Sequence, residues 1–141
     1  MAKFGKWRNP LVEINSVDLS SFFRSAQLNI TRSTEDHTGG GTGEYMDKTV
    51  SRAEWSFTFE LWQSFYTAEV DATLWPLINA PGSGITVKVR PDGGSAVGST
   101  NPDYSGTCYS TDYSPTDGSN DENLSTSITF EGSGALTRAT S

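Results

Sequence analysis

The residues with the greatest capacity for chemistry are scattered, and none completes a catalytic or metal-binding pattern. The only histidine, His37, follows Glu35 and Asp36 in a polar stretch, with no cysteine or second histidine nearby to complete a metal site. The only cysteine, Cys108, has no basic neighbour in the sequence that would lower its pKa, so we expect a structural thiol. A single cysteine also excludes a disulfide within the chain.

Two other stretches resemble ligand-binding loops without matching them. Residues 39–43 are rich in glycine but lack the Gly-Lys-Ser/Thr ending of a phosphate-binding loop. A second stretch begins like a calcium loop, with Asp117, Ser119, Asp121 and Asn123. Glu122 then stands where a glycine is needed and Ile128 stands where the last glutamate belongs, which favours a polar hairpin turn over a weak cation site. We therefore predict no catalytic residue, no metal ligand and no cofactor, and we expect the protein not to be an enzyme.

Length and composition favour one β-rich domain. The chain has 141 residues, with 14 glycines and 16 aromatic side chains (4 Trp, 5 Tyr, 7 Phe), which is enough for an aromatic core between many turns. The net charge is −7, so the chain lacks the basic footprint of a protein that binds nucleic acid tightly. The N-terminal arm, residues 1–10, is basic but has no apolar run after it, so it does not have the pattern of a secretory signal.

Residues 53–63 alternate between apolar and polar side chains, as a strand with one buried face does. The apolar face carries Trp55, Phe57, Phe59 and Leu61, and the polar face carries Glu54, Ser56, Thr58 and Glu60. The same division recurs around Leu28 and around Ile128. The predicted core comprises Leu28, Ile30, Trp55, Phe57, Phe59, Leu61, Leu74, Leu77, Ile128 and Phe130.

The remaining patterns complete an all-β fold with one flanking helix. We predict strands over residues 11–14, 24–33, 49–63, 85–90, 104–113 and 123–131, with a hairpin turn at Asn15-Ser16. Apolar residues at helical spacing predict a helix over residues 67–79 that Thr67 caps and Pro76 weakens. Residues 34–48 break all periodicity and are predicted to be a long loop, and residues 132–141 a tail. One helix beside six or seven strands indicates a β-sandwich or an open barrel.

The order of motifs resembles the major tail proteins of long-tailed phages, which form the tail tube. The resemblance rests on residues 12–20 followed by 24–31, on residues 70–77 (Val-Asp-Ala-Thr-Leu-Trp-Pro-Leu), on 87–91, on 101–108 and on 134–140. It covers nearly the whole chain, so residues 1–141 are expected to be a single tail-tube domain. The resemblance implies a β-sandwich related to the type VI secretion tube protein.

The resemblance also implies an assembly. Such subunits form hexameric rings that stack into a hollow tube, a conduit for DNA ejected into the host. Each subunit contributes a sheet to the lumen, and we expect the lumen-facing residues to be Gln27, Asn29, Thr31, Glu54, Ser56, Thr58, Glu60, Ser125, Ser127 and Thr129. Contacts between subunits or rings are expected at Phe4, Trp7, His37, Gly40, Tyr45 and Met46.

The implied partners are further copies of the chain, a tail terminator, and tail tip and tape-measure proteins. DNA is expected to pass without specific binding, and no membrane contact is expected. The implied location is the virion tail, assembled in the host cytoplasm. The alternative is a β-sandwich carbohydrate-binding or adhesin module, in which Trp62, Tyr109 and Tyr113 would stack on sugar rings.

Overall fold

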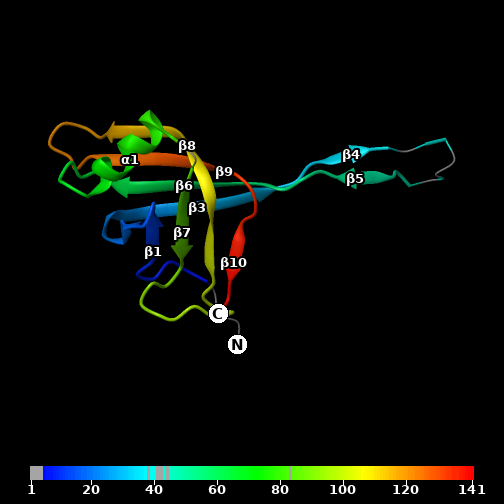
Figure 1. Cartoon of the computed structure of the whole chain (residues 1–141), viewed down its shortest axis with the longest axis horizontal. Coiled ribbons are helices and arrows are strands. Elements are labelled where there is room, and N and C mark those ends of the chain that lie inside the picture. Colours follow the sequence, from blue (N-terminus) through cyan, green and yellow to red (C-terminus); the bar gives the residue numbers. More distant parts are fainter. Residues whose placement is uncertain (1–4, 38, 41–42, 44, 83) are drawn as a thin grey trace.

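The alternating segments form one large antiparallel sheet, and a small two-stranded sheet extends from it (Figure 1). The computed structural model describes residues 5–37, 39, 40, 43, 45–82 and 84–141. Within these residues the elements are, in chain order, β1 (Leu11–Ile14), β2 (Val17–Asp18), the 3-10 helix η1 (Ser20–Phe22), β3 (Phe23–Thr31), β4 (Thr34–Asp36), β5 (Lys48–Val50), β6 (Glu54–Trp62), α1 (Val70–Asn79), β7 (Ile85–Arg90), β8 (Asp103–Asp117), β9 (Ser125–Gly132) and β10 (Thr137–Ala139).

Strand β8 joins the two halves of the large sheet, whose order is β2-β1-β7-β8-β9-β6-β3. The first residues of β8 pair with β7 and β10, and its later residues pair with β9. The register of β8 shifts between Ser110 and Asp112 and again between Ser114 and Asp117, and such β-bulges bend a strand. Strands β7 and β10 consequently cross the direction of β6 and β9 (Figure 1).

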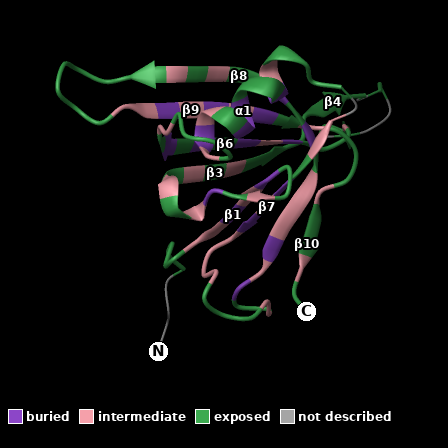
Figure 2. Ribbon diagram, turned by 60° about the vertical axis from the view of Figure 1, so that its left-hand side comes forward, coloured by how far each residue is buried: buried purple, intermediate pink, exposed green. Residues whose placement is uncertain are grey.

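The core lies between the two halves of this bent sheet. The first half contributes Val12, Ile14, Val87 and Val89, and the second contributes Trp55, Phe57, Phe59, Leu61, Ile128 and Phe130. Helix α1 adds Val70, Leu74 and Leu77 and contacts β8. Figure 2 shows the buried residues gathered inside the bend. In the described residues β2 and β3 end the sheet without pairing to each other, so the barrel stays open, as the predicted fold class allows.

Two of the predicted core residues are not fully buried. Ile30 has 54% of its surface exposed, and Leu28 is only half-buried. Both lie on β3, which is the last strand of the sheet and pairs with β6 alone. The placement of Ile30 in the core is therefore wrong, because alternation predicts which face a side chain occupies but not whether another element covers that face.

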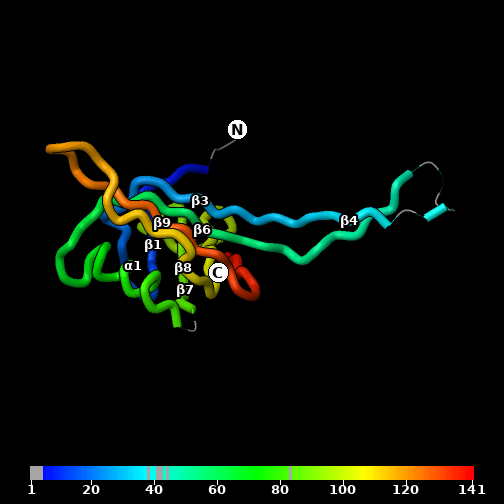
Figure 3. Tube along the Cα trace, turned by 90° about the horizontal axis from the view of Figure 1, so that it is seen from above, coloured from blue at the N-terminus to red at the C-terminus, as the bar shows by residue number. Residues whose placement is uncertain are grey.

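Residues 34–48 are not a structureless loop. Strands β4 and β5 pair antiparallel, with Thr34 opposite Val50 and Asp36 opposite Lys48, and a backbone bond from His37 N to the Asp47 carbonyl (3.0 Å) continues the ladder. The hairpin, residues 34–50 (the β4–β5 arm), projects far from the rest of the protein (Figure 3). The predicted strand over residues 49–63 is accordingly two strands, separated at residues 51–53.

The helix begins later than predicted, and Thr67 does not cap it. Its N-cap is Glu69, whose side chain makes no capping bond. The chain before the helix supplies the partners instead, since Asp71 N donates to the Ser64 carbonyl (3.0 Å) and the Ser64 hydroxyl donates to the Glu69 carboxylate. The helix continues through Pro76 and ends at Asn79. No helix in the described residues is long and apolar enough to cross a membrane.

The C-terminal residues are not simply a tail, because β10 pairs with the start of β8, with Arg138 opposite Tyr104. Strand β8 also runs further than predicted, to Asp117. The turn at Asn15-Ser16 lies where the sequence places it. Both residues have positive φ, 52° and 68°, as the tight turns that match the twist of a hairpin require.

Candidate functional site

The polar sides of β3, β6 and β9 form one continuous face, the polar sheet face. The register aligns their side chains in rows across the strands: Gln27, Thr58 and Thr129; Asn29, Ser56 and Glu131; Ser25, Glu60 and Ser127. All ten residues that we expected on a lumen lie on these strands, and none is buried. Sequence alternation therefore identified a continuous surface of the protein.

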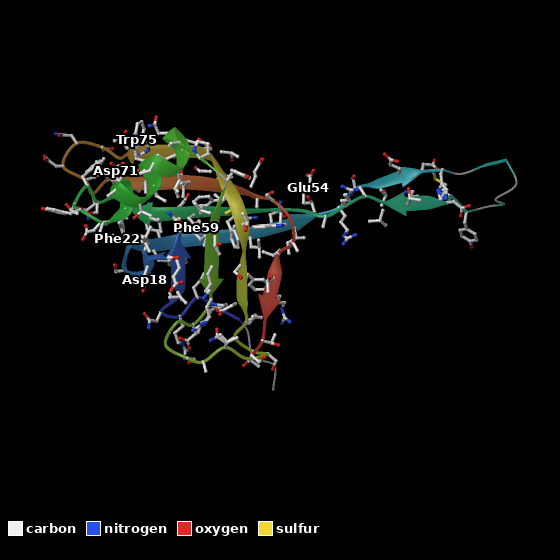
Figure 4. The ribbon with its side chains drawn as sticks, in the orientation of Figure 1. Asp18, Phe22, Glu54, Phe59, Asp71 and Trp75 are labelled. Atoms are coloured by element: carbon white, nitrogen blue, oxygen red, sulfur yellow. The ribbon has the colours of Figure 1, made fainter. Side chains whose placement is uncertain are left out.

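This face is acidic and has no positive charge in its rows. Strand β8 extends the rows with Asp112 opposite Thr129 and Tyr109 opposite Glu131. Four carboxylates lie on the face, those of Glu54, Glu60, Asp112 and Glu131, and no lysine or arginine is paired among them. The Ser25 hydroxyl donates to the Glu60 carboxylate at 3.1 Å. Figure 4 shows Glu54 where β6 leaves the body toward the arm.

The Arg24 side chain lies against Trp62 at one end of the polar sheet face. The Arg24 guanidinium carbon lies 4.4 Å from the centroid of the Trp62 ring, a cation–π contact. Arg24 is positioned by the bulge between Phe23 and Ser25. The Trp62 ring, 41% exposed, is thus partly covered by a side chain of its own subunit.

A row of aromatic rings supports the polar sheet face from beneath. Phe57 and Phe59 stack with centroids 5.6 Å apart, and Phe59 meets Phe130 edge-on at 6.1 Å. Trp55 packs edge-on against Phe57, and its indole Nε1 donates to the Gly134 carbonyl at 3.0 Å. Rigid packing of this kind fixes the strands and hence the positions of the polar side chains on the opposite side.

Sequence analysis missed the two glycines on which Trp55 rests. A Cβ added to Gly132 would lie 2.1 Å from the Trp55 ring, and one added to Gly106 would lie 2.6 Å from it. Both residues must therefore lack a side chain for the indole to fill this space. Glycine within a strand is a signal for such a close approach, although it does not identify the partner.

Sequence analysis also missed the order of the loop over residues 91–102. Arg90 and Asp103 flank it and form a two-point ion pair, at 2.6 Å and 3.0 Å, that raises the pKa of Arg90. The Asn101 side chain bridges the loop, donating to the Asp92 carbonyl (2.8 Å) and accepting from Asp92 N (3.0 Å). The sequence signal that could have predicted this order is the pair of opposite charges, Arg90 and Asp103, on either side of a Gly- and Ser-rich stretch.

The residues that we expected at subunit contacts occupy two regions. His37, Gly40, Tyr45 and Met46 lie in the β4–β5 arm, where Tyr45 is 83% and Met46 60% exposed. Trp7 lies elsewhere and packs on its own subunit's Phe23, with ring centroids 5.2 Å apart, while 42% of it stays exposed. Phe4 lies outside the described residues.

Two titratable side chains inside the protein, Cys108 and Tyr113, have pKa values that burial raises. Burial raises the pKa of the Cys108 thiol to about 12, so the thiol is unreactive at neutral pH. Burial also raises the pKa of Tyr113 to about 12, and its hydroxyl donates to Asp71 Oδ1 at 2.8 Å and accepts from Gln63 Nε2. No group of three or more potential metal ligands occurs in the described part of the chain.

The aromatic residues of the carbohydrate-binding alternative do not form a platform. The Tyr113 hydroxyl is bound to Asp71 of α1, and the Trp62 ring is partly covered by Arg24. Tyr109 stands on the polar sheet face opposite Glu131 and is 37% exposed. Sugar stacking needs open, neighbouring ring faces, so this arrangement does not favour that alternative.

The protein shares its fold with chains solved in the tails and tubes of phage-like particles. No family model matches the sequence, and neither does any curated protein. The structure is similar to a chain in the tail of an empty gene transfer agent particle, which was solved with C6 symmetry. The match covers 98% of this chain and 99% of that one, with a TM-score of 0.67 and 17% identity.

The likeness extends to contractile injection systems. A chain in the sheath–tube complex of an extracellular contractile injection system, in its extended state, matches with a TM-score of 0.70 and 12% identity, over 96% of this chain and 90% of that one. A chain in the tube-terminating cap of the anti-feeding prophage matches with a TM-score of 0.72 and 16% identity, over 100% and 95%. At identities this low, the TM-scores and the nearly complete coverage show a shared fold.

Proposed function

We propose that the protein is a structural subunit of a tail tube, in which hexameric rings stack into a hollow conduit for DNA. The observation that carries the proposal is the polar sheet face, in which three strands present Ser, Thr, Asn, Gln and Glu side chains and no cation in their paired rows. A chain in a six-fold symmetric tail has the same fold. Six copies of such a face would form a closed channel wall.

The chemistry of the polar sheet face suits a conduit. A lumen lined by lysine or arginine would bind DNA phosphates with release of counterions and would hold the DNA in place. The carboxylates of Glu54, Glu60 and Glu131 repel phosphate, and the hydroxyl and amide groups between them stay hydrated. DNA would therefore slide past the ten lumen-facing residues without specific binding.

The edges of the sheet suit self-association. Strand β3 pairs with β6 on one side only, and nine residues of its other edge have no partner strand among the described residues. An exposed edge of this length is a template for pairing with another chain. Head-to-tail contacts that close give rings, and contacts that do not close give filaments. His37, Gly40, Tyr45 and Met46 of the arm, with Trp7 and Phe4, would contact neighbouring subunits or rings.

The proposed role places the protein in the virion tail, assembled in the host cytoplasm. Its partners would be further copies of itself along the tube, a terminator at one end, and tip and tape-measure proteins at the other. The role needs no catalytic group, no cofactor and no membrane contact.

Sedimentation and negative-stain electron microscopy of the purified protein at rising concentration test the proposal. We expect rings and tubes from the unaltered chain. The matched variant joins Asp36 to Lys48, which are opposite each other in the arm, through Asn-Gly, a favoured two-residue hairpin turn. We expect this variant to keep its far-ultraviolet spectrum and to lose long tubes. An unaltered chain that stays monomeric at every concentration and binds glycans would contradict the proposal.

A further inference from the structure

An apolar cleft lies along the open side of the bent sheet. Its volume is about 550 Å³, and cavities of about 300–1,000 Å³, many of them in the mouths of β-barrels, are usual sites for small molecules. Ile30 is 54% exposed because it faces this cleft rather than the core. The walls are mostly apolar and come from β3, β7, β8 and the N-terminal segment, through Trp7, Ala26, Leu28, Ile30, Val89 and Tyr104.

Basic side chains gather at one end of the cleft. A second hollow, of about 720 Å³, shares Trp7, Pro91 and Tyr104 with the cleft, and Lys6 and Arg8 line it. The N-terminal segment, the loop after β7 and strand β10 lie together at this end of the body (Figure 1). The apolar cleft therefore opens toward two cations.

Neighbouring groups do not cancel this positive charge. Arg138 of β10 adds a third cation, since its Nε donates to the Tyr104 hydroxyl at 3.3 Å. Asp92 is the acidic residue that lines the second hollow, and it accepts from Gly94 N and the Ser95 hydroxyl of its own loop. No ion pair joins the two N-terminal cations to another described residue. This end of the cleft is thus positive, although the net charge of the chain is −7.

We propose that the cleft binds a single-chain amphipathic anion, of the class of free medium-chain fatty acids. The alkyl chain lies against Leu28, Ile30 and Val89, and the carboxylate lies beside Lys6 and Arg8. Removal of the alkyl chain from water supplies most of the affinity, and the cations set the orientation of the ligand. The inference goes beyond the proposed function and does not depend on assembly.

Calorimetric titration with decanoate, below its critical micelle concentration, tests the proposal. We expect one site per chain, with octanoate binding roughly tenfold more weakly, because each buried methylene contributes a factor of about four. Backbone amide resonances of Leu28, Ile30 and Val89 should shift with decanoate. No binding, or equal affinity for the two acids, overturns the proposal. Shifts that follow protein concentration and not decanoate would show a second copy in the cleft and would also overturn it.

Two matched glutamate variants test the apolar part of the site. Ile30→Glu places a carboxylate in the cleft and should weaken decanoate binding tenfold or more. Val50→Glu adds the same charge at a position of the arm that is 61% exposed and lies outside the cleft, and it should leave the affinity unchanged. Equal effects of the two variants would contradict the proposed position of the alkyl chain.

Two matched charge variants test the basic end. Lys6→Gln with Arg8→Gln should weaken decanoate binding about tenfold and leave binding of the uncharged decanol nearly unchanged. Arg32→Gln with Arg52→Gln removes the same charge at the base of the arm and should change neither affinity. Equal losses in the two double variants would show a general effect of net charge and would overturn the assigned role of Lys6 and Arg8.

Vesicles of phosphatidylglycerol present similar chemistry on a membrane surface. The cleft accepts one free chain, so flotation with such vesicles should recover no protein. Recovery with vesicles, without binding of free decanoate, overturns the proposal. Every one of these measurements is made on the free subunit, so the inference and the proposed tube are tested separately.

Discussion

Gly132→Ala is the substitution whose effect the structure specifies most closely. The added Cβ would lie 2.1 Å, 2.2 Å and 2.5 Å from three atoms of the Trp55 ring, so the indole must shift by roughly 1 Å to remove the overlap. The ring is only 6% exposed and packs edge-on against Phe57, which leaves it little room. Movement also breaks the bond from its Nε1 to the Gly134 carbonyl.

The expected loss follows from these two effects. Overpacking of a closed core costs about 1–3 kcal/mol, and a lost hydrogen bond about 1 kcal/mol. We therefore expect the free energy of unfolding to fall by about 2–4 kcal/mol, and the melting temperature to fall by roughly 10 °C. Urea unfolding followed by tryptophan fluorescence measures the first quantity, and calorimetry measures the second.

Two controls isolate the contact. Gly98→Ala adds the same methyl group where no heavy atom lies within 4 Å, so the change should stay within about 0.5 kcal/mol. In a Trp55→Phe background the smaller ring should relieve much of the Gly132→Ala penalty, with a coupling energy of about 1–3 kcal/mol. Equal stability of Gly132→Ala and the unaltered protein, or strict additivity in the double variant, would refute the role assigned to this glycine.

Three further predictions concern other parts of the fold. Tyr113→Phe removes the bond to Asp71 that ties α1 to β8 and should lower the free energy of unfolding by about 1–2 kcal/mol in urea titrations, and no loss would show that the bond contributes nothing. Cys108 should resist iodoacetamide in the folded state and be fully labelled in denaturant. The free energy of unfolding should also fall as pH rises from 9.0, the ordinary pKa of the thiol, toward about 12, its pKa in the folded state, because only the folded state keeps the thiol protonated in this range. Ser16→Gly should raise stability by up to about 1 kcal/mol, because it relieves about 1–2 kcal/mol of left-handed backbone strain at a φ of 68° and adds only about 0.4–1 kcal/mol of unfolded-chain entropy, and a loss would show that the Ser16 side chain matters more than its backbone.

The large strands were predictable because each carries a local signal. The alternation around Phe57 and Phe59 fixes which side of β6 faces the core, and pairing in register then assembles the polar sheet face from three strands. The helix was predictable for the same reason, although its start was not, because Ser64 rather than Thr67 serves its first turn.

The other features depend on partners that lie far away in the sequence. Ile30 is exposed because β3 ends the sheet, and strand order is not a property of residues near Ile30. Strand β10 is short and without alternation, and it forms by pairing with β8. The arm strands are polar and brief, and their pairing continues from that of β3 with β6. The contact of the Trp55 ring with Gly132 joins positions 77 residues apart, and no local sequence pattern predicts such a contact.

In the proposed tube the polar sheet face lines the channel. A cryo-electron microscopy reconstruction of tubes assembled from the purified protein would show which way this face points. We expect rings of six subunits, with Ser56, Thr58, Ser127 and Thr129 turned toward the channel axis and helix α1 on the outside. A tube in which these four side chains face outward, or are buried between rings, would contradict it.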